Sequence, residues 1–384
     1  MGAEAEALLE RLVAFPTVAG RPNLDLVGFV AEHLEAHGAA ATVLPGERDD
    51  AANLHAVVGP RDEPGILLAA HSDVVDVEGQ AWSGDPFALR RDGGRLFGRG
   101  TADMKGFLAA VLAVAPYAAR RGLRRPLHLA LSSDEELGCR GVGPLLDALE
   151  DLPVRPAFCV VGEPTGLGVA VRHKGKAAAR VHVRGRACHS SAAPRGVNAV
   201  EYAARLIVAA GDAGRALAAR DGDPGFSVPT ATLSVGPVRG GMALNTVPDA
   251  CTFEIEARAL PGEDAGALLS EALRGTAALE AEMRRVAPEA GIEIEALAAY
   301  PPLAPAGDDG PAALVAGLAG GERGLAVDFG TEAGLYRQRL GVPVVVCGPG
   351  SMAQAHRPDE YVEADQVTRA EALLRGLVDT LAER

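Results

Sequence analysis

The chain has 384 residues and a formal net charge of −14; hydrophobic residues make up 48% of it and aromatic residues only 4%. That length is too great for one ordinary hydrophobic core and predicts about two domains. The acidic excess disfavours binding to nucleic acid or to an anionic membrane surface. Five scattered cysteines without a C-x-x-C pair argue against a disulfide framework and favour a reducing compartment, so we expect a cytoplasmic protein.

The first part of the chain alternates helical and strand-like segments. Apolar periodicity marks the helices and short apolar runs mark the strands. The helices are expected near 4–14, 24–37, 104–120 and 141–149, and the strands near 52–59, 65–70, 127–133 and 157–162. Such alternation predicts an α/β fold with a mostly parallel sheet flanked by helices.

The pattern changes after residue 172. The segments that follow are, in chain order, a strand, a helix, two strands, a helix and a strand. This β-α-β-β-α-β order predicts a small ferredoxin-like α+β domain. Its elements are expected near 176–185, 197–219, 231–238, 251–260, 263–286 and 292–297. A Pro/Gly-rich stretch at 300–311 then leads back to α/β elements near 311–319, 342–348 and 365–382. We therefore expect an α/β domain of residues 1–172 and 301–384, interrupted by an inserted α+β domain of residues 173–300.

Residues with metal-binding side chains follow the apolar run at 65–70. His71 and Asp73 in "AHSD" lie two positions apart, so on a strand they share one face. An aspartate placed there can accept a hydrogen bond from the ring of a metal-bound histidine and fix its orientation. A polar strand exit without a metal explains the same two residues, so this pair alone decides nothing.

Further acidic residues and a histidine also follow apolar runs: Glu135 and Glu136 in "SDEELG", Glu163 in "VGEPT" and His356 in "QAHRPDEY". Asp103 in "GRGTADMKG" lies instead at the beginning of the long predicted helix, behind two glycines. Ligands bind open α/β sheets outside the carboxyl ends of the strands. Carboxylates that converge there repel one another, and cations between them reverse the sign of the interaction. The alternative is a set of solvated loop acids, with Asp103 as an ordinary helix N-cap.

Other kinds of catalytic or cofactor site find little support. No G-x-S-x-G or S-x-x-K motif is present. The third glycine of a Rossmann turn beginning at Gly98 would fall on Asp103. Only Cys188 has a basic local sequence, so a cysteine nucleophile is a weak alternative.

Together these motifs resemble the two-zinc amidohydrolases, the family of acetylornithine deacetylase, succinyl-diaminopimelate desuccinylase, aminoacylase and glutamate carboxypeptidase. The resemblance covers essentially the whole chain, and "GTADMKG", "GEPT", "HKG", "RGVNA" and "GPGS-x-x-QAH-x-PDEY" are most similar to the acetylornithine deacetylases. It implies a zinc-binding α/β domain and an inserted lid domain through which the protein forms a homodimer.

The resemblance also implies a metal-ligand set. His71 corresponds to a ligand of one zinc and His356 to a ligand of the other, while Asp103 corresponds to the carboxylate that bridges both. Glu136 and Glu163 correspond to the remaining ligands, one for each metal. The cofactors implied are two Zn²⁺ ions, for which Co²⁺ can substitute.

Catalytic roles follow from the same resemblance. Glu135 corresponds to the general base and Asp73 to the partner that orients His71. His189 corresponds to a lid histidine that reaches the partner subunit's active site and stabilises the oxyanion. Cys188 precedes it where the family usually has glycine, which weakens the assignment of His189.

Five residues are candidates for contact with the substrate. Asn245 and Arg258 resemble substrate-holding residues of the lid, and Gly330 and Thr331 resemble a substrate-contacting loop. The charges of Lys174 and Arg258 also suit a substrate α-carboxylate.

The expected activity is hydrolysis of the amide bond of an N-acyl amino acid, with N2-acetylornithine as the first expectation and ornithine and acetate as products. A desuccinylase, an aminoacylase or a dipeptidase of the same family is the nearest alternative. A non-catalytic protein that binds metals for stability is a third, which the spare base Glu135 disfavours.

Overall fold

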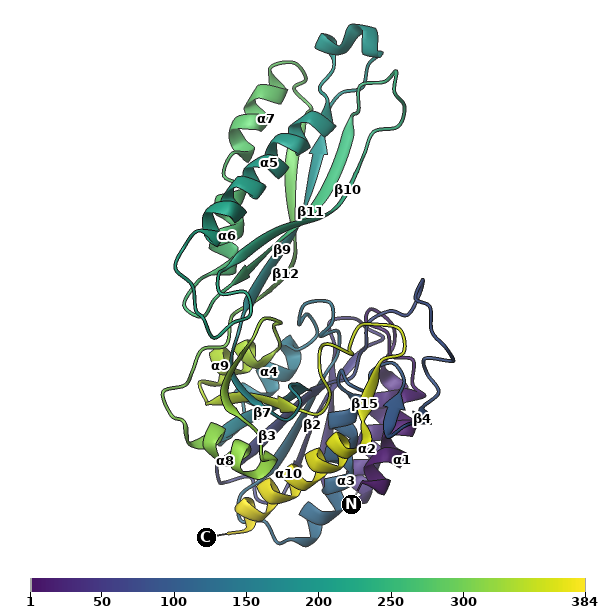
Figure 1. Cartoon of the computed structure of the whole chain (residues 1–384), viewed down its shortest axis with the longest axis vertical. Helices are drawn as coiled ribbons and strands as arrows, with labels where there is room; N and C mark the ends of the chain where they lie inside the picture. Colours follow the sequence, from purple (N-terminus) through teal and green to yellow (C-terminus); the bar gives the residue numbers. More distant parts are fainter. Residues whose placement is uncertain (1, 384) are drawn as a thin grey trace. The chain divides into compact units, whose positions relative to one another are not determined.

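The computed structural model describes residues 2–383, which fold as two compact units (Figure 1). Unit 1 comprises Met1–Arg172, Leu303–Ala326 and Thr331–Arg384. Unit 2 comprises His173–Pro302 and Val327–Gly330. The chain thus leaves unit 1 and returns to it, and the roles of the units as catalytic and lid domains stay predictions.

Unit 1 is built on an eight-stranded sheet in the order β1-β2-β6-β3-β7-β14-β8-β13. The strands are, in chain order, β1 Ala40–Pro45, β2 Ala52–Val58, β3 Ile66–His71, β6 Leu127–Ser132, β7 Phe158–Pro164, β8 Val169–His173, β13 Arg323–Val327 and β14 Val344–Gly348. β6, β3, β7 and β14 are mutually parallel neighbours, and antiparallel pairs occur toward both sides of them. The central strands are buried throughout, because helices cover both faces of a parallel sheet. The predicted α/β fold is confirmed.

Helices cover the two faces of this sheet (Figure 1). One layer packs around a central helix and contains α1 Ala3–Val13, α2 Leu24–Ala36, α3 Lys105–Arg120, α8 Gly310–Ala319 and α10 Ala364–Ala382. Helix α3 is buried on nearly every side, which its unbroken apolar sequence permits. A second group contains α4 Gly143–Glu150 and α9 Ala333–Leu340, which contact each other.

A small three-stranded sheet stands beside the large one and ties distant motifs together. Its strands are β4 Arg90–Asp92, β5 Arg95–Phe97 and β15 Tyr361–Glu363, in the order β15-β5-β4. β5 leads directly into the "GRGTADMKG" segment, and β15 follows the segment that contains His356. The pairing of Tyr361 with Phe97 therefore holds two candidate metal-binding segments side by side.

Unit 2 is an antiparallel sheet with helices on one face (Figure 1). Its elements are β9 Gly175–Arg184, the 3-10 helix η1 Ser190–Arg195, α5 Ala199–Ala218, β10 Thr232–Gly240, β11 Ala250–Ala259, α6 Ala265–Ala272, α7 Thr276–Arg284 and β12 Gly291–Tyr300. The strand order is β10-β11-β9-β12. Side chains of β9 and β11 alternate between the core and solvent, as expected for a sheet covered on one face. The predicted α+β plan is confirmed.

The structure differs from the predicted elements in detail. The single helix expected at 263–286 is two helices, α6 and α7, separated at Leu273–Gly275. Glycine at the break has a low helix propensity and permits the change of direction. Strands β8 and β13 and helix α9 were not predicted, because they are short and lack a clear apolar period. Within residues 2–383, no helix has the length and apolarity needed to cross a membrane.

Candidate metal centre

The carboxyl ends of parallel strands bring the candidate ligands of unit 1 together. His71 is the last residue of β3, and Glu163 lies near the end of β7. Glu135 and Glu136 lie on the turn that follows β6, and Asp103 lies just before α3. All four elements meet at one edge because β6, β3 and β7 run parallel as neighbours.

Asp103 lies between two histidines. Its Oδ1 is 3.1 Å from Nε2 of His71, and its Oδ2 is 3.1 Å from Nε2 of His356. Nε2 of His356 is also 3.2 Å from Oε1 of Glu136. One carboxylate thus presents a separate oxygen to each of two imidazoles, an arrangement suited to a ligand shared by two cations.

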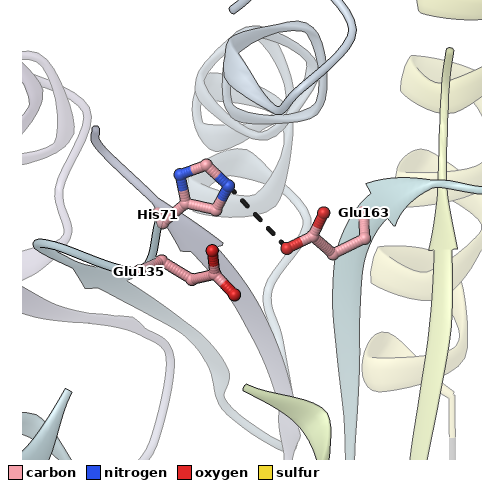
Figure 2. A group of neighbouring side chains, drawn as sticks. All are labelled: His71, Glu135 and Glu163. Carbon is pink, nitrogen blue, oxygen red and sulfur yellow. Dashed lines mark ion pairs between the residues drawn. The ribbon is translucent and has the colours of Figure 1, made fainter. Parts of the chain in front are cut away.

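Glu135 and Glu163 add further possible metal-ligand atoms near His71. Oε1 of Glu163 is 3.7 Å from Nε2 of His71. Potential ligand atoms of His71, Glu135 and Glu163 lie within 4.8 Å of one another, and so do those of His71, Asp103 and Glu136. Figure 2 shows the carboxylates of Glu135 and Glu163 directed toward the same space beside the His71 ring.

The protonation of these groups reflects burial and mutual repulsion. Burial, and then the neighbouring carboxylates Asp103 and Glu135, raise the pKa of Glu163 well above its ordinary value. Burial and the charge of Asp103 raise the pKa of Glu136 to about 7. Burial opposes protonation of His356, yet hydrogen bonds to Asp103 and Glu136 raise its pKa to about 10. Without cations, protons shared among these closely spaced carboxylates and imidazoles therefore stabilise the cluster.

This donor set fits divalent metal ions. Imidazole nitrogen and carboxylate oxygen are ligands that zinc accepts, and two distinct triads around His71 offer such atoms. Cations would supply the positive charge that bound protons now provide, and metal binding releases protons from such ligands. The same chemistry would also suit other divalent ions, so the donors support a metal site without fixing the element.

Asp73 contacts the site differently from its predicted geometry. Nδ1 of His71 donates to the main-chain oxygen of Asp73 at 2.9 Å, while Oδ1 of the Asp73 side chain lies 3.6 Å away. The Asp73 carboxylate instead accepts hydrogen bonds from the backbone N–H groups of Glu135, at 3.1 Å, and Glu136, at 3.0 Å. Asp73 therefore orients the turn that carries the candidate base and a candidate ligand, as well as His71.

Asp134, the first acid of "DEELG", faces away from the metal cluster. Its Oδ1 accepts from the backbone N–H of Gly20 at 2.8 Å, and its Oδ2 accepts from Nη1 of Arg48 at 2.5 Å. Asp134 is buried and has a φ of 52°, a left-handed conformation that aspartate tolerates. It anchors the turn, so three adjacent carboxylates are directed to different partners.

A buried ion pair that sequence reasoning missed supports Asp103. The side chains of Arg99 and Glu360 are each 1% exposed, and Nη1 of Arg99 donates to Oε2 of Glu360 at 2.5 Å. Oε1 of Glu360 accepts from the backbone N–H groups of Ala102, at 2.9 Å, and Asp103, at 3.1 Å. Both residues lie inside the motifs "GRGTADMKG" and "PDEY", which was the available signal.

In unit 2, His189 and Asn245 are neighbours. The backbone N–H of Ser190 donates to the main-chain oxygen of Asn245 at 2.9 Å, and His189 forms a β-bridge with Thr246. Nδ1 of His189 accepts from the backbone N–H of Ser191 at 3.2 Å. This contact places the proton of a neutral His189 ring on Nε2, which is then a donor.

The other substrate-binding candidates have partners of their own. The Lys174 ammonium donates to the main-chain oxygens of Val228 and Thr230 at 2.7 and 3.0 Å and pairs with Asp328 at 3.2 Å. These contacts account for its three donors, so this geometry lends no support to the predicted substrate role of Lys174.

Arg258 donates to the Tyr300 hydroxyl at 2.9 Å and to Glu256 at 3.1 Å. Gly330 packs against Tyr300 so closely that a Cβ would lie 2.2 Å from its ring. Thr331 is buried, and its hydroxyl oxygen accepts a hydrogen bond at 2.9 Å from the backbone N–H of Ala333, the first residue of helix α9. These contacts stabilise the fold and do not test a role in substrate binding. The substrate roles of Arg258, Gly330 and Thr331 therefore stay predictions.

Known proteins resemble this chain over most of its length. Residues 67–380 match the model of peptidase family M20/M25/M40. Acetylornithine deacetylase of Myxococcus xanthus is 34% identical over 380 residues, covering 96% of this chain and 95% of its own. Acetylornithine deacetylase of Proteus mirabilis (strain HI4320) is 31% identical over 389 residues, covering 98% and 97%.

Solved structures share the fold at lower identity. Human carnosine dipeptidase 1 superimposes with a TM-score of 0.77 at 14% identity, covering 99% of this chain and 97% of its own. An M20 family metallo-carboxypeptidase from Sulfolobus solfataricus gives 0.77 at 16% identity, covering 99% of each chain. The Bacillus subtilis YXEP protein, a dinuclear metal binding peptidase, gives 0.68 at 14% identity, covering 99% and 98%. The chain belongs to peptidase family M20/M25/M40 and is a metallohydrolase of that family.

Proposed function

We propose that this metallohydrolase removes the acyl group of an N-acyl amino acid, with N2-acetylornithine as substrate and ornithine and acetate as products. The observation that carries the proposal is the position of Glu135, whose carboxylate lies in the same group as His71 and Glu163. When His71, Asp103, Glu136, Glu163 and His356 serve as the ligands, Glu135 is left as a carboxylate beside them. The relatives named acetylornithine deacetylase, which match nearly the whole chain, support the choice of substrate.

Two ions would be held by the donors that Asp103 joins. His71 and Glu163 would complete one site, and His356 and Glu136 the other. Bound divalent ions supply an activated water and polarise the carbonyl of the substrate. We propose zinc as the native metal, with cobalt as a substitute: the imidazole and carboxylate donors accept both ions, and the resemblance to the two-zinc amidohydrolases favours zinc.

Glu135 acts as the general base in this mechanism. It takes a proton from the water as the water oxygen forms a bond to the amide carbon. It then returns the proton to the amide nitrogen as the C–N bond breaks, which releases the free amine and the acid. Burial, and then the carboxylates of Glu136, Glu332 and Asp73, raise the pKa of Glu135 well above its ordinary value, although the charge of His71 opposes them.

Unit 2 would complete the site. The N–H at Nε2 of His189 is suited to donate to the developing oxyanion, and Asn245 beside it to hold the substrate. Arg258 would bind the α-carboxylate in exchange for one of its present partners. We further propose that the protein is a cytoplasmic homodimer joined through unit 2, so that His189 serves the partner subunit's active site.

A metal-dependent substrate panel tests the proposal. The purified protein is stripped with a chelator, reloaded with zinc or cobalt, and assayed for release of the free amine or amino acid. The panel contains N2-acetylornithine, N-succinyl-diaminopimelate, N-acetylmethionine and a dipeptide. We expect the highest kcat/KM on N2-acetylornithine and no turnover in the stripped protein.

Each other outcome has a definite meaning. A preference for the succinyl substrate, another acyl amino acid or the dipeptide would contradict the assigned substrate. The protein would still be a metallohydrolase. Full activity after metal removal would contradict the metal centre. Bound metal with no turnover across the panel would favour a non-catalytic metal-stabilised protein.

A further inference from the structure

A cavity of about 290 Å³ lies in unit 1 over strands β1, β2 and β6, next to the end of helix α4. Its polar lining comes from Thr42, His55, Arg61 and His128, and the rest of the lining is apolar. His128 is near the beginning of β6, whereas the candidate metal centre follows its end at Ser132. The four residue steps from His128 to Ser132 along an extended strand span about 13 Å, so the cavity is separate from that centre.

Two imidazoles form the polar floor of the cavity. Nε2 of His55 and Nδ1 of His128 are 3.0 Å apart, and the rings are nearly parallel, with an interplanar angle of 9°. One nitrogen must donate to the other, so each neutral ring uses one nitrogen within the pair. In either tautomer, one of the two outer nitrogens then carries a hydrogen and the other carries a lone pair. The pair therefore always offers one unused N–H donor.

The surroundings of this pair lack the negative charge that is abundant elsewhere in the chain. Burial, then Arg61, lower the pKa of His55 to about 4; burial, His55 and Arg61 do the same for His128. Within residues 2–383, no carboxylate forms a hydrogen bond or an ion pair with either ring. Arg61 is exposed and has no ion-pair or hydrogen-bond partner among the described residues.

This cavity contrasts with the candidate metal centre, where carboxylates face both histidines. An arginine without a counter-ion and a free imidazole N–H are complementary to an anion. Leu44, Val57, Leu152 and Val154 contribute apolar walls, which would bury a hydrocarbon group. Those walls offer few hydrogen bonds, so they disfavour a fully hydrated anion such as inorganic phosphate.

We propose that this cavity is a second ligand site, which binds a small carboxylate with a compact apolar body. The carboxylate contacts the Arg61 guanidinium and the free N–H of the His55–His128 pair, and the hydrocarbon part lies between β1 and the end of α4. The site is independent of the metals and of the substrate of the hydrolase.

Calorimetric titration of the metal-loaded protein with benzoate tests this site. Benzamide has the same shape without the charge, and inorganic phosphate has the charge without the apolar body. We expect benzoate to bind with a Kd on the order of 1 mM, and benzamide and phosphate to bind at least about tenfold more weakly.

Three variants locate the binding. Arg61→Gln removes the charge and should weaken benzoate binding by about tenfold. Ala148→Phe fills the cavity from its half-buried lining residue and should abolish binding. Arg120→Gln removes an equally exposed charge outside the cavity and should change nothing. Thermal melting of each variant checks that it is folded.

The controls make contrary results decisive. Equal benzoate affinity in wild type, Arg61→Gln and Ala148→Phe would place the binding elsewhere, including at the metals, and would overturn the proposal. Equal binding of benzamide would show that charge plays no part and would overturn it too. Binding of phosphate in preference to benzoate would contradict the assigned ligand class.

Discussion

The thiol of Cys139 lies 3.4 Å from Oε1 of Glu135. Both residues belong to the turn after β6, where the backbone N–H of Cys139 also donates to the main-chain oxygen of Glu135 at 2.7 Å. Burial, then the Glu135 charge, raise the pKa of the Cys139 thiol well above its ordinary value, so the thiol keeps its proton and donates it to the carboxylate. Cys139 thus fixes one oxygen of the proposed base and leaves the other free to face the ligand cluster.

Replacing Cys139 should therefore slow the chemical step. We expect Cys139→Ala to lower kcat by about three- to tenfold with little change in KM, because Glu135 loses the contact that orients it. Cys139→Ser keeps a donor and should restore most of the rate. Cys159→Ala removes a second buried thiol on β7 and is the matched control for a packing defect. A rate loss that is equal in all three variants would assign the effect to packing.

The adjacent residues Glu135 and Glu136 should respond differently to the same substitution. Glu135→Gln should retain both metals and lose on the order of 10²- to 10⁴-fold in kcat, because only the proton carrier is removed. Glu136→Gln should lose metal, because a ligand to the His356 site is removed. Metal content by elemental analysis and steady-state kinetics separate the two roles. Unchanged turnover in Glu135→Gln would exclude Glu135 as the base.

Asp73→Ala should weaken metal binding without touching a ligand atom. The Asp73 carboxylate accepts the N–H groups of Glu135 and Glu136, so its removal frees the turn that positions both. We expect a loss of about 10- to 100-fold in metal affinity, the effect typical of partners that orient ligands. Titration of the stripped protein with zinc against a competing chelator measures it. An unchanged affinity would show that the turn keeps its conformation without Asp73.

The sequence predicted which candidate ligands lie close together, but it did not predict the contacts behind them. His71, Glu136 and Glu163 each follow an apolar run, and parallel strands must place such residues at one edge of the sheet. Neither hydrophobic periodicity nor a position after a strand predicts the contact of Glu360 in the same way. Glu360 reaches Ala102 and Asp103 only because β15 pairs with β5. That contact joins segments more than two hundred residues apart, and no local pattern encodes it.

Short elements escaped prediction for a related reason. β8 and β13 contribute to the large sheet, yet each has only five residues and neither shows regular alternation of buried and exposed side chains. Their conformation depends on tertiary pairing at the side of the sheet rather than on intrinsic propensity. The partners of Lys174 were hidden similarly, since Val228, Thr230 and Asp328 come from loops with no period to detect.

The buried pair of Arg99 and Glu360 should show strong coupling. Removing one partner leaves a charge buried without compensation, so Arg99→Met or Glu360→Gln should each cost about 3–5 kcal/mol in free energy of unfolding. The double variant should cost much less than the sum of the two. Urea denaturation of the wild type, the two single variants and the double variant measures the coupling energy. If the losses in free energy of unfolding simply add, the two side chains do not interact directly. Both Glu360 variants should also bind metal more weakly, because Glu360 holds the backbone at Asp103.

The imidazole pair beneath the second cavity should make stability depend on pH. Burial, and then neighbouring positive groups, lower the pKa values of His55 and His128 to about 4 in the folded protein, against 6.5 for an ordinary histidine. Between pH 6.5 and pH 4, the unfolded chain therefore binds protons that the folded chain excludes. Stability from this source is complete above pH 6.5 and decreases as the pH falls through that window.

The slope of that decrease can be measured against a variant that cannot titrate. Each histidine accounts for up to about 1.4 kcal/mol of unfolding free energy per pH unit within the window. In His55→Asn/His128→Asn, this contribution is absent, while the titration of every other group remains. The difference in urea-derived stability between wild type and this variant should therefore shift in favour of the variant as the pH falls from 7 to 5. A difference that does not change with pH would show that the two histidines have the same pKa values in the folded and the unfolded protein.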